Sequence, residues 1–125
     1  MITKDLLNNS TVKSLIAAAS LDTATHTGDT VDLLGVGRKV LVVINAGTPG
    51  AGGTLNVVVH ESDDNFAAND DVLHTFAEIT AAGLAEADLA PNKRYIRVVA
   101  TVGVAVFPAA VEGVVYLERK IPSGI

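Results

Sequence analysis

The sequence predicts an all-β protein, an antiparallel β-sandwich or jelly-roll-like fold of about seven to nine strands with no long helix. In the segment 93–102, one period-two face carries only apolar residues, namely Ile96, Val98, Ala100 and Val102. The other face is mixed, which is typical of a half-buried antiparallel strand. Such segments recur at intervals of roughly 8–20 residues between glycines and prolines. Tryptophan is absent, so small aliphatic side chains must fill the core, and these suit a thin sandwich.

The N-terminal half contains the least regular of these segments. We expect a strand over 12–19, although the spacing of its apolar residues and its three successive alanines also suit a helix. A Gly28-Asp29 turn predicts a hairpin between the threonine-rich residues 23–27 and a short strand at 31–34. Residues 38–46 are apolar on both faces in the middle, which predicts a central strand.

The C-terminal half alternates more clearly. The segments with a strand pattern are residues 54–61, 72–80, 84–89 (a short strand or a turn), 93–102, 104–107 and 111–117. The inward faces are expected to be Leu55, Val57 and Val59 in the first of these, and Leu73, Thr75, Ala77 and Ile79 in the second. Pro108 is expected to interrupt pairing, because proline cannot donate to a ladder. Residues 47–53 have four glycines and a proline and are predicted to form a loop.

Length and composition indicate one domain. We expect an N-terminal arm at 1–11, a single sandwich domain at 12–120 and a C-terminal tail at 121–125. The absence of cysteine excludes disulfides and thiolate metal sites. The first residues do not have the pattern of a secretory signal, and no apolar run approaches the roughly 20 residues of a membrane span. We therefore expect neither export by such a signal nor a membrane partner.

The net charge of −5 arises in one eleven-residue segment, which holds Glu61, Asp63, Asp64, Asp70 and Asp71. The remaining nine acidic residues balance the nine Lys and Arg, so no nucleic-acid partner is indicated. With Asn65 and Asn69, this segment has enough oxygen atoms to bind Ca²⁺. It lacks the glycine and the bidentate glutamate of an EF-hand, so a solvated acidic loop is the preferred interpretation.

No catalytic or cofactor motif can be named. The glycines of residues 47–54 lack the lysine of a phosphate-binding loop and precede a strand instead of a helix. His26, His60 and His74 have no metal-ligand spacing. No nucleophile motif is present, so we expect a protein that is not an enzyme and has no cofactor.

Cations gather at predicted strand ends, at Arg38-Lys39, at Lys93-Arg94 with Arg97, and at Arg119-Lys120. Two interpretations stay open. The cations either cluster to meet acidic loops of an adjacent subunit, or they protect strand ends and keep the protein soluble.

The order of several segments resembles a known family. Thr-Gly-Asp-Thr-Val-Asp-Leu-Leu-Gly (27–35) is followed by a valine-rich strand, a glycine-rich loop and Glu-Ser-Asp-Asp (61–64). Pro-Asn-Lys-Arg-Tyr-Ile-Arg-Val-Val-Ala-Thr-Val (91–102) completes the pattern, with its most recurrent part at residues 94–97. Over about residues 12–120 the chain resembles small all-β virion structural proteins of tailed bacteriophages or prophages.

The resemblance implies a non-enzymatic protein that decorates and stabilises the assembled capsid. The implied partner is the major capsid protein of the same virion, bound by a homo-oligomer for which a trimer is one option. The implied location is the capsid surface, after assembly in the cytoplasm of the host bacterium. The residues expected at the interface are Leu6, Leu7, Arg94, Tyr95, Arg97 and Tyr116. The alternatives are a head–tail connector or tail component that forms a ring, and a Ca²⁺- or carbohydrate-binding β module.

Overall fold

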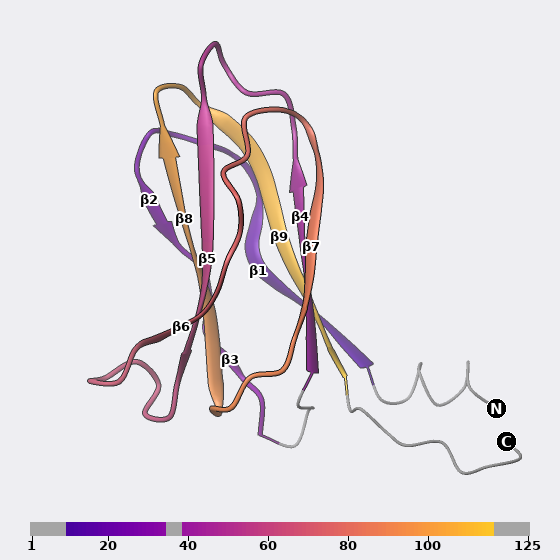
Figure 1. The fold of residues 1–125 in the computed structure, drawn as a ribbon, viewed down its shortest axis with the longest axis vertical. Helices are drawn as coiled ribbons and strands as arrows, with labels where there is room; N and C mark the ends of the chain where they lie inside the picture. Colours follow the sequence, from indigo (N-terminus) through magenta and orange to yellow (C-terminus); the bar gives the residue numbers. More distant parts are fainter. Residues whose placement is uncertain (1–9, 35–38, 117–125) are drawn as a thin grey trace, which may run out of the picture.

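The computed structural model describes residues 10–34 and 39–116, which form nine strands in two antiparallel sheets packed face to face (Figure 1). The four-stranded sheet has the order β1 (Ser10–Leu21), β9 (Phe107–Tyr116), β4 (Lys39–Ala46), β7 (Gly83–Leu89). The five-stranded sheet has the order β2 (Thr25–Thr27), β8 (Tyr95–Gly103), β5 (Thr54–Ser62), β6 (Asp71–Thr75), with β3 (Val31–Asp32) also paired to β8. The predicted all-β sandwich is therefore confirmed, and no helix occurs in the described residues. None of these residues accordingly forms a helix able to span a membrane.

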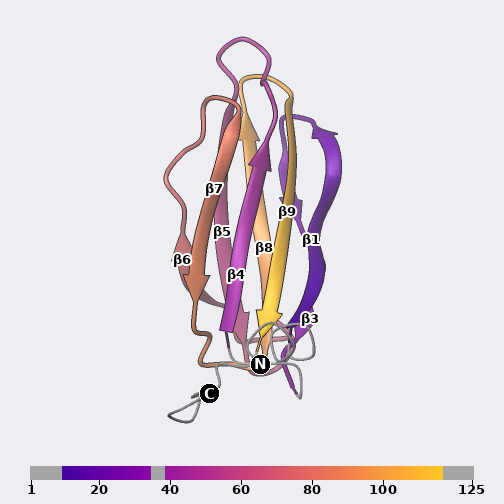
Figure 2. The same ribbon diagram turned by 90° about the vertical axis from the view of Figure 1, so that its right-hand side faces the viewer.

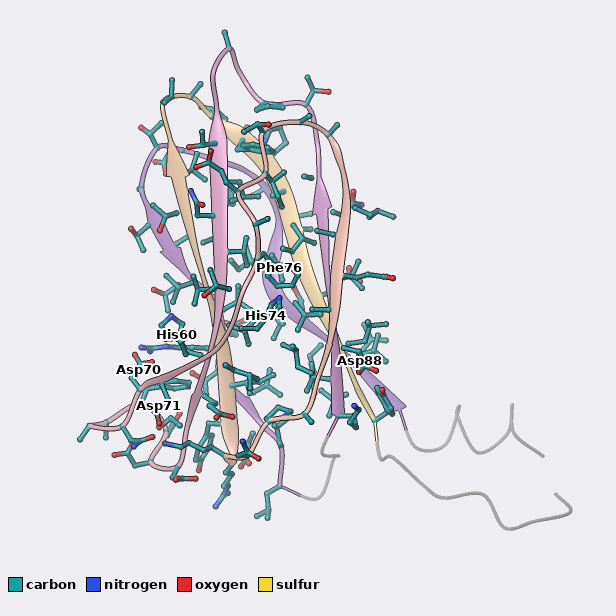
Figure 3. All side chains as sticks on the ribbon, viewed as in Figure 1. His60, Asp70, Asp71, His74, Phe76 and Asp88 are labelled. Carbon is teal, nitrogen blue, oxygen red and sulfur yellow. The ribbon has the colours of Figure 1, made fainter. Side chains whose placement is uncertain are left out.

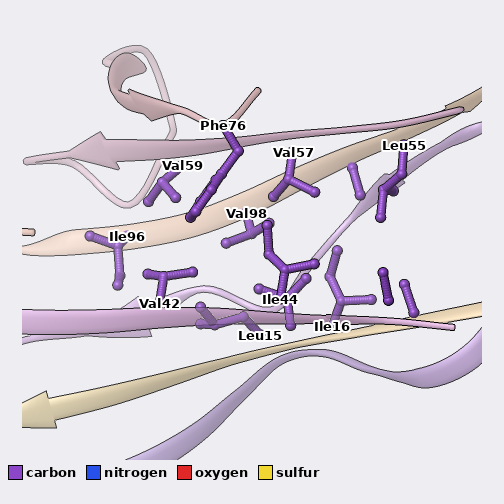
Figure 4. Close-up of a cluster of buried hydrophobic side chains, with 14 of the residues drawn as sticks. Leu15, Ile16, Val42, Ile44, Leu55, Val57, Val59, Phe76, Ile96 and Val98 are labelled. Carbon is purple, nitrogen blue, oxygen red and sulfur yellow. The ribbon is translucent and has the colours of Figure 1, made fainter. Parts of the chain in front are cut away.

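The core lies between the sheets and follows the period-two pattern. Ile96, Val98 and Ala100 of β8 are fully buried, as are Leu55 and Val57 of β5. Figure 4 shows Ile96, Val98 and Val57 facing Val42 and Ile44 of the opposite sheet. The aliphatic inward faces predicted for these two strands are confirmed, because each strand has one face against the core and one outside.

The strand expected at 12–19 is part of β1, which starts at Ser10 and so takes in the last two residues of the expected arm. Its pairing with β9 shifts register between Ser14 and Ile16 and again between Ile16 and Ala19. A bulge turns successive residues to the same face, and Leu15 and Ile16 are both buried. This irregularity explains why the apolar spacing of the segment also suited a helix.

The expected hairpin at Gly28-Asp29 is wrong. β2 and β3 do not pair with each other but pair one after the other with β8. The Gly28 N–H donates to Val98 O at 2.7 Å in the five-stranded sheet, and the Asp29 N–H donates to Leu15 O at 3.0 Å in the four-stranded sheet. These two residues therefore join the sheets along one long side of the sandwich.

Two further expectations are wrong in the second half of the chain. β6 ends at Thr75, and Phe76 enters the core while Thr75 and Ala77 stay exposed. Of the predicted inward face of 72–80, only Leu73 and Ile79 pack against the core. Pro108 does not interrupt pairing: β9 runs continuously through it, opposite Ser20 of β1. The missing N–H is tolerated because Pro108 is the second residue of the strand, beyond the register shared with β4. Residues 104–106 form a turn instead of a separate strand.

The predicted central position of the strand at 38–46 is confirmed. β4 pairs with β9 on one side and with β7 on the other, so it lies inside the four-stranded sheet (Figure 2). Val40, Val42 and Ile44 alternate into the core and are fully buried. The lower end of the five-stranded sheet in this view contains the candidate site, because β6 and β8 begin there and β5 ends there.

Candidate interaction site

The acidic segment folds back over the start of β8, where it meets the cations that the sequence places there. Lys93 lies against the loop that joins β5 to β6: its Nζ donates to Asn69 Oδ1 at 2.7 Å, is hydrogen-bonded to Asp71, and lies 4.0 Å from Asp63 Oδ2. The hydrogen bond to Asp71 raises the pKa of Lys93, and the negative charges of Asp71 and Asp63 act in the same direction.

Asp70 connects two side chains from neighbouring strands of the five-stranded sheet. Its Oδ1 lies 2.6 Å from His60 Nδ1 on β5, and its Oδ2 accepts from the Arg97 guanidinium at 3.1 Å (Figure 3). The guanidinium also lies 4.1 Å above the ring of Phe66, a cation–π contact. Arg97 Nε is buried without a hydrogen-bond partner, so Asp70 and Phe66 provide the contacts that stabilise this charge.

Asp64 holds the loop between β5 and β6 in shape through hydrogen bonds to residues of that loop and to Ser62 at the end of β5. Its carboxylate accepts hydrogen bonds from the Ser62 hydroxyl at 2.8 Å and from the backbone N–H groups of Ala68 and Asn69 at 3.0 and 3.1 Å. These bonds, first among them the one from Ser62, lower the pKa of Asp64. Asn65 and Phe66 have positive φ angles of 57° and 60°, which the tight turn of the loop requires.

The carboxylates that the sequence suggested as Ca²⁺ ligands instead form hydrogen bonds and ion pairs with other groups of the protein. Asp64 accepts backbone N–H groups, Asp70 pairs with His60 and Arg97, and Asp71 pairs with Lys93. Glu61 is buried and accepts a hydrogen bond from the backbone N–H of Asn92 at 2.9 Å. Within residues 10–34 and 39–116, no group of three or more acidic or histidine side chains is arranged to hold a metal ion.

A second ion pair fixes the start of β8 to β3. Arg94 binds Asp32 through two bonds, Nε to Oδ1 at 2.9 Å and NH2 to Oδ2 at 2.8 Å. The Leu34 N–H also donates to Asp32 at 3.0 Å. The hydrogen bonds from Arg94 are the main cause that lowers the pKa of Asp32 from 3.8 to about 2. The guanidinium of Arg94 also makes a cation–π contact with the ring of Tyr95, at 4.9 Å from its centre. Tyr95 lies on the outer face of β8, so the ion pair and the ring are neighbours there.

The structure brings together three of the predicted interface residues and separates a fourth. Arg94, Tyr95 and Arg97 lie at one end of the five-stranded sheet, on or beside its outer face. Tyr116 belongs to the other sheet, where its hydroxyl donates to Asp88 at 2.8 Å; Figure 3 shows Asp88 on the opposite side of the sandwich from His60 and Asp70. Leu6 and Leu7 lie outside the described residues.

The first interpretation of the cation groups needs a correction. Lys93, Arg94 and Arg97 meet carboxylates of their own chain, and Lys39 lies 3.9 Å from Asp88, so these acids need not come from an adjacent subunit. Arg38, Arg119 and Lys120 lie outside the described residues. Sequence reasoning missed Asp32 and Asp88 as partners. No local signal could have found Asp32, since it lies 62 residues before Arg94.

Comparison with known proteins supports the fold. No family model and no curated protein matches the chain. The PBSX exported protein XepA is 21% identical with a TM-score of 0.69, over 92% of this chain and 40% of XepA. The protein of infectious bursal virus derived T=1 particles is 9% identical with a TM-score of 0.50, over 86% of this chain and 31% of the viral protein. The chain spans less than half the length of either, and at these identities the likeness shows a shared fold.

Proposed function

We propose that this protein is a non-enzymatic structural protein of a tailed-phage or prophage virion, and that it decorates and stabilises the assembled capsid. The observation that supports the proposal most is the state of the polar groups at the candidate site. Its carboxylates, the ammonium of Lys93 and the guanidinium of Arg94 have partners within the chain, and of the buried side-chain polar atoms that the structure describes only Arg97 Nε lacks one. The site is therefore a preformed surface, and the described residues contain no activated group for a reaction.

The arrangement of His60 illustrates the absence of an activated group. Its carboxylate partner Asp70 is also bound by Arg97, and no hydrogen bond in the described part of the chain joins a serine or threonine hydroxyl to a histidine. A nucleophile activated by a neighbouring base needs such a bond. A protein with a rigid surface can bind a shell tightly even if each contact is weak. Many symmetry-related copies on the shell bind together, and this produces avidity.

The shared fold is compatible with this role, since one of the proteins that have it forms T=1 particles. The family resemblance of residues 94–97 adds the link to phage virions and to a major capsid protein as partner. Arg94, Tyr95 and Arg97 stay our proposal for the contact surface. Because Arg94 and Arg97 already have carboxylate partners, the ring of Tyr95 and the exposed part of the Arg94–Asp32 pair would contribute most.

Co-sedimentation with phage heads that lack the protein tests the proposal. We expect the purified protein to pellet with the heads in many copies, and electron microscopy to show density spread over the shell. Density in one ring at a single vertex would instead favour a head–tail connector. Failure to pellet, together with absence of the chain from purified virions by mass spectrometry, would refute a virion role. Tyr95→Ala should weaken pelleting, and Tyr116→Ala, on the opposite sheet, serves as its control.

A further inference from the structure

The two long sides of the sandwich differ. On the side of β1 and β2, the backbone of Gly28 and Asp29 joins the sheets. On the side of β6 and β7, no hydrogen bond among the described residues joins the two strands. The apolar side chains that are only partly buried against the core all belong to this second side, and they are Leu73, Ile79, Ala85, Ala87 and Leu89. The core is therefore incompletely covered along β6 and β7.

The outermost strand on this open side is unusually regular for an edge. β7 pairs with β4 over seven consecutive residues without a register shift, and Figure 2 shows it at the border of the front sheet. It has no proline, lysine or bulge, three of the devices that commonly prevent an edge from pairing, and its only charged residues are Glu86 and Asp88. Among the described strands, the other edges are interrupted or short: β1 and β6 have register shifts against their neighbours, and β2 and β3 have three and two residues.

An exposed antiparallel edge has free backbone groups, because alternate residues direct their N–H and C=O away from the paired neighbour. No other strand, turn or loop among the described residues donates to or accepts from β7 on its outer side. The edge can therefore accept one further extended segment, which would continue the four-stranded sheet and lie over the partly buried side chains of β6.

The side chains of β7 specify what such a segment must look like. Ala85, Ala87 and Leu89 point to the core side, so the residues opposite them must be apolar. On the outer face, Leu84, Glu86 and Asp88 are exposed, and Asp88 accepts from the Tyr116 hydroxyl and lies 3.9 Å from Lys39 Nζ. Glu86 has no ion pair or hydrogen bond with the described residues, and neither has Glu112, which lies across Val43 from it in the same cross-strand row. This outer face has an excess of negative charge beside the free edge.

The same charges disfavour a second copy of β7. If two β7 strands paired antiparallel about Glu86, the two Glu86 carboxylates would lie directly opposite each other, which is destabilising. A strand with lysine or arginine on its outer face would instead form cross-strand pairs with Glu86 and Asp88. The acidic residues thus select against self-association and in favour of a basic partner.

We propose that the free edge of β7 binds an extended segment of a partner protein in which apolar residues alternate with lysine or arginine. The backbone provides the ladder hydrogen bonds, and the apolar residues cover Leu73 and Leu89. The basic residues pair with Glu86 and Asp88. This inference goes beyond the proposed function and does not depend on it, since the partner segment is defined by its chemistry.

The test uses the full chain and a blocked synthetic peptide of about nine residues that alternates valine and lysine, which is long enough to pair along the whole of β7 and within the usual range of strand lengths. The control peptide has the same sequence with alternate backbone nitrogens methylated, which keeps its charge and removes its ladder donors. We expect calorimetry to show the parent peptide binding at least ten-fold more tightly than the methylated one. Amide chemical-shift changes are expected to be largest in β7.

A pair of charge-matched variants separates edge pairing from general attraction to an acidic protein. Glu86→Lys should weaken binding of the parent peptide at least ten-fold. Asp22→Lys makes the same charge change at an exposed residue beyond the end of β1, on the closed side, and should weaken it less than two-fold. The inference is overturned if the methylated peptide binds as tightly as its parent, if the two variants lose affinity equally, or if the parent peptide does not bind. None of these measurements involves the capsid, so the outcome is distinguishable from failure of the proposed function.

Discussion

The turn at Gly28 offers the sharpest test of how the two sheets are joined. A Cβ atom at this position would lie 2.1 Å from the backbone oxygen of Leu15, far inside van der Waals contact, and the nearest obstacle is backbone that cannot rotate away. To accommodate Gly28→Ala, the turn must move by roughly 1 Å, the deficit against an ordinary contact distance. That movement breaks the bond from the Gly28 N–H to Val98 O, at 2.7 Å, and the bond from the Asp29 N–H to Leu15 O, at 3.0 Å.

The expected cost follows from these contacts. Two backbone hydrogen bonds contribute about 0.5–1.5 kcal/mol each, and the unpaired groups left behind add to the loss. We expect Gly28→Ala to lower the free energy of unfolding by about 2–4 kcal/mol, a large part of the 5–15 kcal/mol of a typical domain. Urea denaturation followed by circular dichroism measures this change directly.

A second glycine provides the control for this substitution. At Gly113 a Cβ atom would meet the end of the Leu15 side chain at 3.2 Å, and a flexible side chain can shift. Gly113→Ala should therefore cost clearly less than Gly28→Ala. If Gly28→Ala changed the unfolding free energy by less than about 0.5 kcal/mol, as an ordinary surface substitution does, the two sheets would not depend on this turn and the reasoning would be refuted.

Three further substitutions test local features. Val104 is 76% exposed with a φ of 69°, so Val104→Gly should relieve strain and raise stability by about 1 kcal/mol in urea denaturation; a lower midpoint would contradict this. Ser62→Ala removes three hydrogen bonds to Asp64 and Phe66 and should cost about 1–3 kcal/mol, with loss of hydrogen-exchange protection at the Phe66 amide as the direct readout. The pKa of Asp32 is lower in the folded protein, about 2 against 3.8, so its stabilisation is complete above the unfolded value and lost as pH falls towards 2. Asp32→Asn should therefore flatten the loss of stability between about pH 4 and pH 2, and equal slopes for both proteins would contradict the ion pair.

The sequence alone was sufficient for the strands whose pattern is regular. In β8, and in β5 as far as Glu61, successive residues alternate between the core and the outside. This period of two is a local property that can be read without knowledge of any neighbour. The apolar residues on both faces of β4 likewise predicted its central place in the sheet, where its inner face is buried and its outer face is mostly half-buried. The aliphatic composition likewise predicted a thin two-layer core.

Predictions from the local sequence pattern were wrong where strands distant in the sequence determine the structure of a segment. The register shifts in β1 depend on its pairing with β9, and the departure of Phe76 from the line of β6 depends on space in the core. Gly28 and Asp29 have the chemistry of a hairpin turn, but the hydrogen bonds to Leu15 and Val98 make them a link between sheets. The preference of these residues for a hairpin turn is overridden, because burial and hydrogen bonds to distant strands contribute more to the stability of the fold than the propensity of a turn.

The candidate site shows the same division between sequence and tertiary structure. The sequence by itself determined that the acidic segment and the cations of Lys93, Arg94 and Arg97 exist, and that the outer face of β8 displays Arg97 beside Tyr95. Only the tertiary structure decided that these charges neutralise each other, that Asp32 binds Arg94, and that β7 is left as a regular acidic edge. The physical reason is distance along the chain: ion pairs and free edges depend on which strands become neighbours, and strand order is set by the packing of the whole sandwich.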